Sequence, residues 1–455
     1  MKRILFMALN SSWSQSNLAL YYLREVIRDL DYETVMAAFT LKEPLPQIME
    51  EVYHLQPDII CFSAYIWNRA CLQELQVELA KIMPQTRFVV GGPESGAFLP
   101  DHRVYVISGP GERSFYELAK SGFTSVPKPG ANFPLSEIPF PYRQEDEVDL
   151  AGHLIYYECF RGCPYGCIYC LSARDCRREA RFDLSQEEDF KRLYSELRVL
   201  ASLKPRTLKF IDRSFNTQKQ LAKEIWRFAI ENDLDFDLHF EIYPDLIEDK
   251  DIELLSKAPA GRIRFEVGIQ STNDEVLERC GRVSSWQKSR KVLIALKQRT
   301  EIRLHTDLLV GLPGEDFASV IRSLNELCAC DPAAVQLGIL KILPDTPMLD
   351  IATKRGYLWM NNPPYQVLQT DVLSFAELCL LQDYAHLLSL YWNKEEYPDT
   401  WHSLLQLYPA DRILDALLSI HRRDSIPLHS VSRQKRAMIM TELCSALELP
   451  QKRIL

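Results

Sequence analysis

The sequence predicts an α/β chain with three parts: a doubly wound domain of Rossmann or flavodoxin type, a partial (β/α)6 barrel of TIM type, and a C-terminal α-helical region. Two observations carry this prediction. Short apolar runs alternate with helix-period segments up to about residue 340, as in βα units that build parallel sheets. A Pro-rich stretch interrupts the alternation once, and strand-like runs stop near residue 370. We therefore assign 1–122 to the first part, 123–150 to a linker, 151–347 to the barrel and 348–455 to the helical region.

Each part has its own succession of elements. In the first part, the expected strands are 4–9, 34–39, 58–65, 87–90 and 104–107, and the expected helices are 18–30, 43–54, 72–82 and 112–120. In the barrel, the expected strands are 153–158, 207–211, 236–241, 263–269, 302–310 and 334–340, with helices such as 186–203 and 218–232. The C-terminal region should contain helices at 375–391, 411–421 and 432–447. Chemistry in such a barrel belongs at the C-terminal ends of its strands.

The composition bounds the class of protein. The chain has 455 residues, 47% hydrophobic and 25% charged, which excludes a disordered, collagen-like or disulfide-dense chain. Its net charge of -9 argues against nonspecific nucleic-acid binding through a global positive field. No apolar run is long enough for a transmembrane helix and no signal peptide is evident, so we expect a cytoplasmic protein without a membrane partner. In that reducing compartment, 12 cysteines indicate metal or redox chemistry before disulfides.

One motif concentrates sulfur ligands. The segment Cys163-Pro-Tyr-Gly-Cys167-Ile-Tyr-Cys170 follows the first expected barrel strand, in a loop that also contains Gly162. Soft thiolates select iron–sulfur clusters, zinc or copper(I). Three cysteines leave one iron of a 4Fe–4S cluster without a protein ligand, which is the open position that a substrate-binding cluster needs. Two alternatives stay open: a structural zinc site with Cys159 or Cys176 as fourth ligand, and buried cysteines without a common role.

The barrel residues resemble a known family. CxxxCxxC with an aromatic residue before the last cysteine resembles the radical S-adenosylmethionine (SAM) superfamily. Three further segments, Arg264–Ser271, Thr306–Glu315 and Lys341–Pro347, resemble motifs of the branch that contains coproporphyrinogen dehydrogenases and methylthiotransferases. Asp345 stands where that branch has glycine in the last of these motifs. The four motifs occur in family order along the barrel.

The first part resembles the cobalamin-binding domain that precedes this barrel in a large, class B-like subgroup. The resemblance lies in Asp58–Ser63, Val90–Glu94 and Gly109–Phe115. The chain lacks D-x-H-x-x-G and carries Gln15 where relatives have histidine, so no histidine is expected below cobalt. Pro110 also departs from the usual G-E-G-E. The alternative is a Rossmann-like domain that has lost its cofactor. The C-terminal helices resemble an uncharacterised tail of such proteins.

The resemblance implies roles for residues in both domains. Cys163, Cys167 and Cys170 would ligate the cluster, whose open iron would bind SAM. The residues implied for SAM binding are Tyr169, Asp212, Glu266, Gln270 and Asp307. The residues implied for cobalamin binding are Ser63, Gly91, Gly92 and Glu112.

Each of these roles has a structural alternative. Tyr169 could be an ordinary loop aromatic, Glu266 and Gln270 could form satisfied hydrogen bonds in the core, and Asp307 could form a salt bridge. A basic run near the cysteine motif could steer an anionic substrate or reductant, or form a solvated face. The run consists of Arg174, Arg177, Arg178 and Arg181.

The implied function is reductive cleavage of SAM by a cobalamin-dependent enzyme that transfers a methyl group to an unactivated carbon. A cobalamin-independent radical rearrangement, cyclisation or oxidation is a second reading, and a non-catalytic iron–sulfur redox or oxygen sensor is a third. Methylthiotransferase activity is disfavoured because the first part contains only Cys61 and Cys71, without that family's three cluster cysteines. The resemblance also implies an electron donor such as flavodoxin or ferredoxin, and a small-molecule or peptide substrate.

Overall fold

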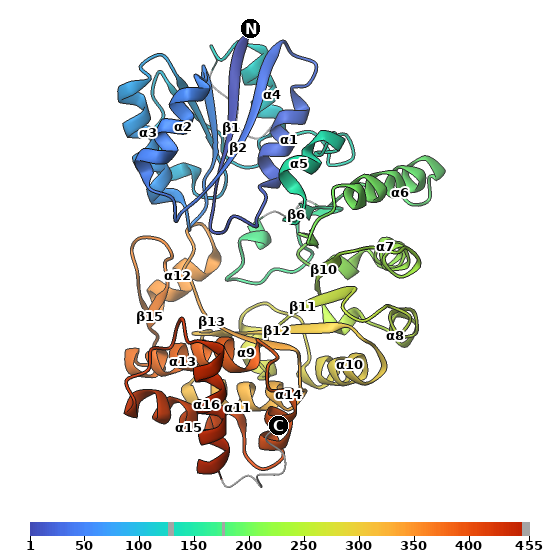
Figure 1. Cartoon of the computed structure of the whole chain (residues 1–455), viewed down its shortest axis with the longest axis vertical. Coiled ribbons are helices and arrows are strands. Elements are labelled where there is room, and N and C mark those ends of the chain that lie inside the picture. Colours follow the sequence, from blue (N-terminus) through green and yellow to red (C-terminus); the bar gives the residue numbers. More distant parts are fainter. Residues whose placement is uncertain (126–131, 175–177, 448–455) are drawn as a thin grey trace. The chain divides into compact units, whose positions relative to one another are not determined.

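The computed structural model describes residues 1–125, 132–174 and 178–447 (Figure 1). The chain divides into two compact units, which we describe separately. The first unit consists of Met1–Arg161, Glu179–Ile211 and Leu234–Asp237. The second consists of Gly162–Arg178, Asp212–Asp233 and the chain from Leu238 onward. The predicted fold class, an α/β chain with parallel sheets and C-terminal helices, is confirmed.

The first unit contains a five-stranded sheet in the order β2-β1-β3-β4-β5. All neighbouring strands run parallel. The strands are β1 (Lys2–Asn10), β2 (Tyr32–Thr40), β3 (Ile59–Ser63), β4 (Arg87–Gly91) and β5 (Val104–Val106). Their central members are almost continuously apolar, which is why they can be buried on both faces.

Helices cover both faces of this sheet. They are α1 (Leu18–Val26), α2 (Leu45–Leu55), α3 (Arg69–Ile82) and α4 (Glu112–Lys120). Figure 1 shows α2 and α3 on one side of the blue sheet and α1 and α4 on the other. On the first face, Val52 of α2 and Leu75 of α3 join a core cluster with Leu5 and Phe62 of the sheet. On the second face, the Phe6 and Phe115 rings lie 5.7 Å apart.

The described part of the Pro-rich stretch packs into the first unit. Leu135, Ile138 and Tyr142 are fully or almost fully buried, and the Tyr142 hydroxyl donates to the Tyr156 carbonyl at 2.5 Å. The stretch ends in a short helix, α5 (Glu147–Leu150). The described part of the stretch is therefore packed against the first unit, although its composition is typical of a linker.

The second sheet has six strands, whose order in the sheet equals their order in the sequence. The strands are β6 (Leu154–Tyr157), β9 (Thr207–Phe210), β10 (Asp237–Ile242), β11 (Ile263–Gln270), β12 (Arg303–Val310) and β13 (Ala334–Ile339). The helices that alternate with them are α6 (Glu187–Ser202), α7 (Lys219–Glu231), α8 (Asp249–Leu255), α9 (Asp274–Arg279), α10 (Trp286–Arg299) and α11 (Phe317–Cys328). This is the predicted βα succession of a partial barrel.

In the second unit, β11 and β12 alternate strictly between buried and half-buried residues. The half-buried face of these strands carries polar side chains in register, so Glu266 lies beside Glu241 on β10 and beside His305 on β12. Asp307 lies one row further along, between Gly268 and Gln336. A barrel strand with this alternation presents a polar face on which a ligand can bind.

The remaining elements are C-terminal or too short to have been predicted. The C-terminal elements are α12 (Pro347–Lys354), α13 (Phe375–Leu387), a π-helical turn (Leu388–Trp392), α14 (Pro398–Leu405), α15 (Ala410–Arg423) and α16 (Arg433–Ala446). Two short antiparallel ladders were not expected: β7 (Phe160–Arg161) with β8 (Glu179–Ala180), and β14 (Leu358–Trp359) with β15 (Val367–Gln369). Their strands are too short to show a hydrophobic period.

Candidate functional site

The cysteine motif lies in a loop whose ends are joined by a two-stranded ladder. β7 and β8 pair antiparallel, Phe160 with Ala180 and Arg161 with Glu179, and the chain between them is the segment Gly162–Arg178. We call this segment the cysteine loop. It begins at Gly162 with a φ of 97°, a conformation that glycine adopts without steric cost. The ladder fixes the point at which the loop begins and ends.

The three motif cysteines are free thiols on this one loop. Cys167 is buried, whereas Cys163 and Cys170 are half-buried. The Cys170 amide donates to the Cys167 carbonyl at 3.1 Å, and the Cys163 Sγ lies 3.9 Å from the Ser214 Oγ. Three soft donors on a turn-rich loop fit the ligand set of an iron–sulfur cluster.

The geometry also bears on the zinc alternative. In the described residues, no group of three or more His, Cys, Asp or Glu side chains is arranged around a single metal ion. A 4Fe–4S cluster instead spreads its thiolate ligands over separate irons. Of the two fourth ligands considered for zinc, Cys159 is fully buried and Cys176 lies outside the described residues.

Backbone contacts within the second unit hold the cysteine loop. The Ile168 amide donates to the Cys280 carbonyl, and the Met348 amide donates to the Ile168 carbonyl, both at 3.0 Å. Gly281 approaches so closely that a Cβ there would lie 2.9 Å from the Gly166 carbonyl oxygen. The loop is therefore fixed against the chain that follows α9 and the first turn of α12.

A half-buried cation, Arg282, lies beside the loop. The Arg282 guanidinium donates to the Gly268 carbonyl and lies 4.8 Å from the centre of the Tyr243 ring. Tyr243 in turn stacks on Tyr165 of the loop, with ring centres 4.1 Å apart. Burial raises the pKa of the Cys167 thiol, and the positive charge of Arg282 opposes that increase. Arg282 thus favours the thiolate form that binds metal.

The predicted residues of β11 lie on its half-buried face. Glu266 Oε2 is 2.9 Å from His239 Nε2 of β10. Gln270 has a φ of 72° and lies at a β-bulge, where its side-chain amide folds over Gly268. Gly268 is therefore needed to leave room for that amide. The two side chains are only half-buried, so they remain available to a ligand as well as to the protein.

Asp307 and Asp212 lie in different settings. Asp307 is half-buried on the polar face, with its Oδ1 3.8 Å from His305 Nε2, a contact that is a salt bridge only when the imidazole is protonated. Asp212 is only 2% exposed. The next residue, Arg213, pairs with Glu241 at 3.6 Å, and Ser214 contacts Cys163 as described above. The segment that contains Asp212 therefore lies against both β10 and the cysteine loop.

Tyr169 packs into a small cluster within the second unit. Together with Ile168, it lies against Val276, Cys280 and Leu312. Burial raises the pKa of its hydroxyl, which is placed near the Cys167 thiol. Tyr169 thus packs this part of the cysteine loop against other residues of the second unit.

In the first unit, the predicted residues lie at the C-terminal ends of the strands. Ser63 of β3 pairs in register with Gly91 of β4. A Cβ at Gly91 would meet no atom within 4 Å, so the space beside it is open. Gly92 is different, because its φ is 94° and a Cβ there would lie 2.5 Å from the Ala64 carbonyl oxygen. Gly92 therefore accommodates the close approach of the Ala64 backbone, and its implied role in cobalamin binding stays a prediction.

Glu112 is already engaged with the protein. It is the first residue of α4, is only 7% exposed, and accepts a hydrogen bond from Arg161 Nη2 at 2.8 Å. Arg161 also pairs with Glu158. The carboxylate of Glu112 thus contacts the guanidinium of Arg161, two residues before Cys163.

The basic residues near the motif do not form one exposed surface. Arg181 is fully buried and pairs with Glu196 at 2.9 Å, which corrects both of its expected roles, steering and solvation. Arg178 is exposed, and its Nη2 lies 3.4 Å from the Pro164 carbonyl oxygen. Arg177 lies outside the described residues, and only the backbone of Arg174 is described.

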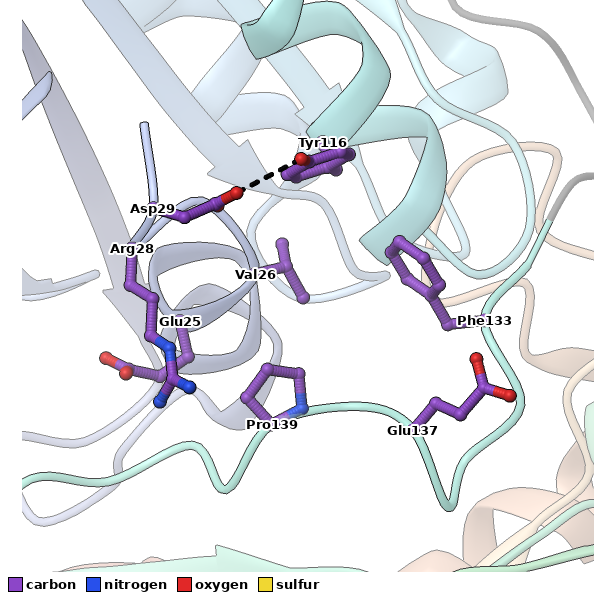
Figure 2. Close-up of a pocket in the computed structure, with 8 residues that line it drawn as sticks. All are labelled: Glu25, Val26, Arg28, Asp29, Tyr116, Phe133, Glu137 and Pro139. Carbon is purple, nitrogen blue, oxygen red and sulfur yellow. Dashed lines mark hydrogen bonds between the residues drawn. The ribbon is translucent and has the colours of Figure 1, made fainter. Parts of the chain in front are cut away.

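Sequence reasoning missed the contacts of Arg282, His239 and Arg213. None of the three belongs to a spaced motif, so the sequence offers no signal beyond their proximity to motif residues. Figure 2 shows a further feature that no motif indicated, a cavity of about 420 Å³ in the first unit, beside α1 and Tyr116 of α4. There Tyr116 donates to Asp29 at 3.1 Å, and none of the predicted site residues lines the cavity.

Comparison with protein families follows the division that the motifs predicted. Residues 7–119 match the B12 binding domain, and residues 157–327 match the radical SAM superfamily. The chain joins a B12-binding domain to a radical SAM domain. Residues 353–411 match a protein family of unknown function, DUF4080. The cofactors of these domains are cobalamin, a 4Fe–4S cluster and SAM, as predicted.

Curated relatives match part of the chain. The ribosomal protein uS12 methylthiotransferase RimO of Trichlorobacter lovleyi is 29% identical over 181 residues, which cover 38% of this chain and 40% of RimO. The heme chaperone HemW of Bacillus subtilis is 24% identical over 231 residues, covering 46% of this chain and 55% of HemW. The chain thus spans about half the length of these relatives.

Solved structures share the fold over most of the chain. The radical SAM methyltransferase TsrM from Kitasatospora setae, with tryptophan substrate and a SAM analogue bound, has a TM-score of 0.62 at 19% identity, covering 79% of this chain and 77% of TsrM. The cobalamin-dependent radical SAM enzyme OxsB, with aqua-cobalamin and SAM bound, has a TM-score of 0.67 at 14% identity, covering 98% and 79%. At these identities the likeness concerns the fold. Within the described residues, no helix is both long and apolar enough to cross a bilayer.

Proposed function

We propose that this protein is a cobalamin-dependent radical SAM methyltransferase that acts on an unactivated carbon. The observation that carries the proposal is the presence, in one chain, of three free cysteines on a fixed loop of a radical SAM domain and a B12-binding domain before it. When bound, the cluster supplies an electron that cleaves SAM, and cobalamin supplies a cobalt that carries a methyl group.

The cysteine loop would hold the cluster through Cys163, Cys167 and Cys170. The carbonyl of Cys280 and the amide of Met348 both hold the backbone of Ile168, between Cys167 and Cys170. The positive charge of Arg282 lowers the cost of ionising Cys167. A loop that is held in this way reduces the reorganisation that cluster binding requires.

SAM would bind along the polar face of the second unit. Glu266 and Gln270 of β11 offer an acceptor and an amide, and Asp307 of β12 adds a carboxylate one row further along. These acceptors suit the ribose hydroxyls and the amino group of SAM, whereas the cation Arg282 suits its carboxylate. Tyr169 and Asp212 lie close to the loop and would support this binding site rather than form all of it.

Cobalamin would bind at the strand ends of the first unit. The open space beside Gly91, next to Ser63, suits the close approach of a large flat ring. Glu112 would act through its ion pair with Arg161. The loop after β1 contains Gln15 in place of histidine, so the cobalt should have no protein ligand from below.

The substrate would be a small molecule or a peptide, and the reductant a flavodoxin or ferredoxin. The exposed Arg178 gives the cysteine loop a positive charge. Both reductants are acidic proteins, so this charge favours their approach to the loop.

Anaerobic reconstitution with iron, sulfide and hydroxocobalamin, followed by assay of the products of SAM, tests the proposal. Both 5′-deoxyadenosine and S-adenosylhomocysteine are expected. Deoxyadenosine without S-adenosylhomocysteine would indicate a radical reaction other than methyl transfer. Neither product, with a full cluster present, would favour the non-catalytic sensor.

A further inference from the structure

The two ends of the cysteine loop are fastened in the first unit by two buried arginines. Arg161 lies on β7, and its Nη2 contacts Glu112 at 2.8 Å and also Glu158. Arg181 follows β8, pairs with Glu196 and donates to the Ile138 carbonyl at 3.1 Å. An arginine thus lies at each end of the cysteine loop, on β7 and directly after β8, and each has a carboxylate partner outside the loop.

The partners of the two arginines differ in kind. Arg181 is fastened to α6 and to the Pro-rich stretch, which contain none of the predicted cofactor residues. The partner of Arg161, Glu112, immediately follows the turn Gly109–Gly111, which is among the strand-end segments of the B12-binding domain. The Glu112 carboxylate is also held in place by the N-terminus of α4, where negative charge is favoured.

The contact is stiff enough to transmit a displacement. The side chains of Arg161 and Glu112 are only 13% and 9% exposed, so the pair is poorly screened. Arg161 also pairs with Glu158, so separating it from Glu112 would leave mainly the Glu112 carboxylate without a counter-charge; that cost favours joint displacement of the two side chains. Arg161 is followed directly by Gly162 and Cys163, so a shift of Arg161 reaches the first cluster ligand through two peptide bonds.

We propose that Arg161 is a positioning residue that couples cobalamin binding at the Gly109–Glu112 turn to the cysteine loop. This inference rests on the proposed function, since it requires cobalamin to bind at that turn. Its consequence is that occupancy of the B12-binding domain changes the order of the loop that holds the cluster. The coupling uses the planar fork of arginine, which lysine cannot replace at two carboxylates.

Hydrogen–deuterium exchange of the anaerobic holoprotein, with and without hydroxocobalamin, tests the coupling. In the wild type, cobalamin should slow exchange on the order of fivefold or more in peptides from 109–115 and from 162–170. In Arg161→Lys, which keeps the positive charge but not the planar fork, and in Arg161→Gln, which removes the charge, slowing should persist at 109–115 and be lost at 162–170. Iron content should stay at the wild-type level in both variants.

Arg143→Gln is the matched control, because Arg143 pairs with Glu25 at 2.7 Å in the same unit, away from the turn. It should retain slowing in both peptides. Slowing of both peptides in Arg161→Lys and Arg161→Gln, or of 109–115 alone in the wild type, would overturn the coupling and leave the proposed function intact. No slowing of 109–115 in the wild type would overturn the cobalamin site and the coupling with it.

Discussion

Gly91 and Gly92 are adjacent residues with different structural reasons for being glycine. Gly91 ends β4 beside open space, whereas Gly92 adopts a left-handed conformation because its neighbour is the Ala64 backbone. A side chain can be added at Gly91 without displacing neighbouring atoms, whereas one at Gly92 would collide with the Ala64 backbone. The pair therefore separates the effect of filling the cofactor space from the effect of distorting the domain.

Gly91→Leu should weaken cobalamin binding while leaving the melting temperature close to that of the wild type, because the new side chain enters open space. Gly92→Leu should lower the melting temperature, because backbone strain and a contact with Ala64 together cost about 1–3 kcal/mol or more. Equilibrium dialysis against hydroxocobalamin and a thermal scan measure the two effects. Unaltered cobalamin affinity in Gly91→Leu would place the cofactor elsewhere.

Glu315 is a second residue whose setting has a measurable effect. Its carboxyl group is 1% exposed, and it accepts hydrogen bonds from Ser271 at 2.5 Å and Ser319 at 3.3 Å. Burial raises its pKa to about 7, against the lowering effect of the two hydroxyls. Between its unfolded pKa and this value, the folded state binds the proton more tightly than the unfolded state does.

Stability should therefore fall as the pH rises from about 4.5 to about 7, on the order of 1.4 kcal/mol for each unit by which the pKa is raised. Glu315→Gln should remove this contribution. The difference in melting temperature between the variant and the wild type should thus move in favour of the variant as the pH rises from 5.5 to 8. A difference that is constant over this range would show that Glu315 does not titrate as described.

At the scale of elements, the β-bulge in β11 determines which polar side chains lie together on the half-buried face of that strand. It places Gln270 at a positive φ and turns its amide over Gly268, next to Glu266 on the same face. Sequence reasoning found these two residues by their motif, but it could not find His239, which the register of β10 brings to Glu266. A partner that another strand contributes cannot be recognised from the local sequence.

Glu266→Ala and Gln270→Ala should keep the iron content and weaken SAM binding by roughly tenfold to a hundredfold, as expected for one lost hydrogen bond to a polar ligand. His239→Ala should weaken binding less, because it contacts Glu266 and would orient the carboxylate only indirectly. Titration with SAM under anaerobic conditions measures the three affinities. Wild-type affinity in the first two variants would make the residues structural.

At the scale of the whole molecule, the cysteine loop and the B12-binding domain belong to different units. Cys167→Ser should lose most of its iron and still bind hydroxocobalamin, with the spectrum of a cobalamin that has no histidine below cobalt. Cys280→Ala is the control, because the Cys280 side chain is fully buried in the apolar cluster with Val276 and Leu312 and lies outside the cysteine loop. Iron loss in Cys280→Ala would make it a fourth ligand.

The sequence was sufficient for most of the architecture because hydrophobic periods report buried faces directly. The strands of both sheets and the helices α6, α7 and α15 lie where the periods predicted them. What it could not supply were tertiary partners: Arg181 looks solvated in a run of basic residues, but Glu196 and full burial make it part of the core. Likewise, β7 and β8 have no pattern of their own, since two residues cannot establish a period.

That two-residue ladder has a consequence for how the cluster can be assembled. A free segment of about 17 residues loses roughly 2–3 kcal/mol of chain entropy when its ends are brought together. In this protein β7 and β8 close the segment as part of folding, so the ends are already joined before iron arrives. The iron–sulfur cluster therefore binds to a segment whose ends are already joined, and none of its binding energy is needed to close that segment.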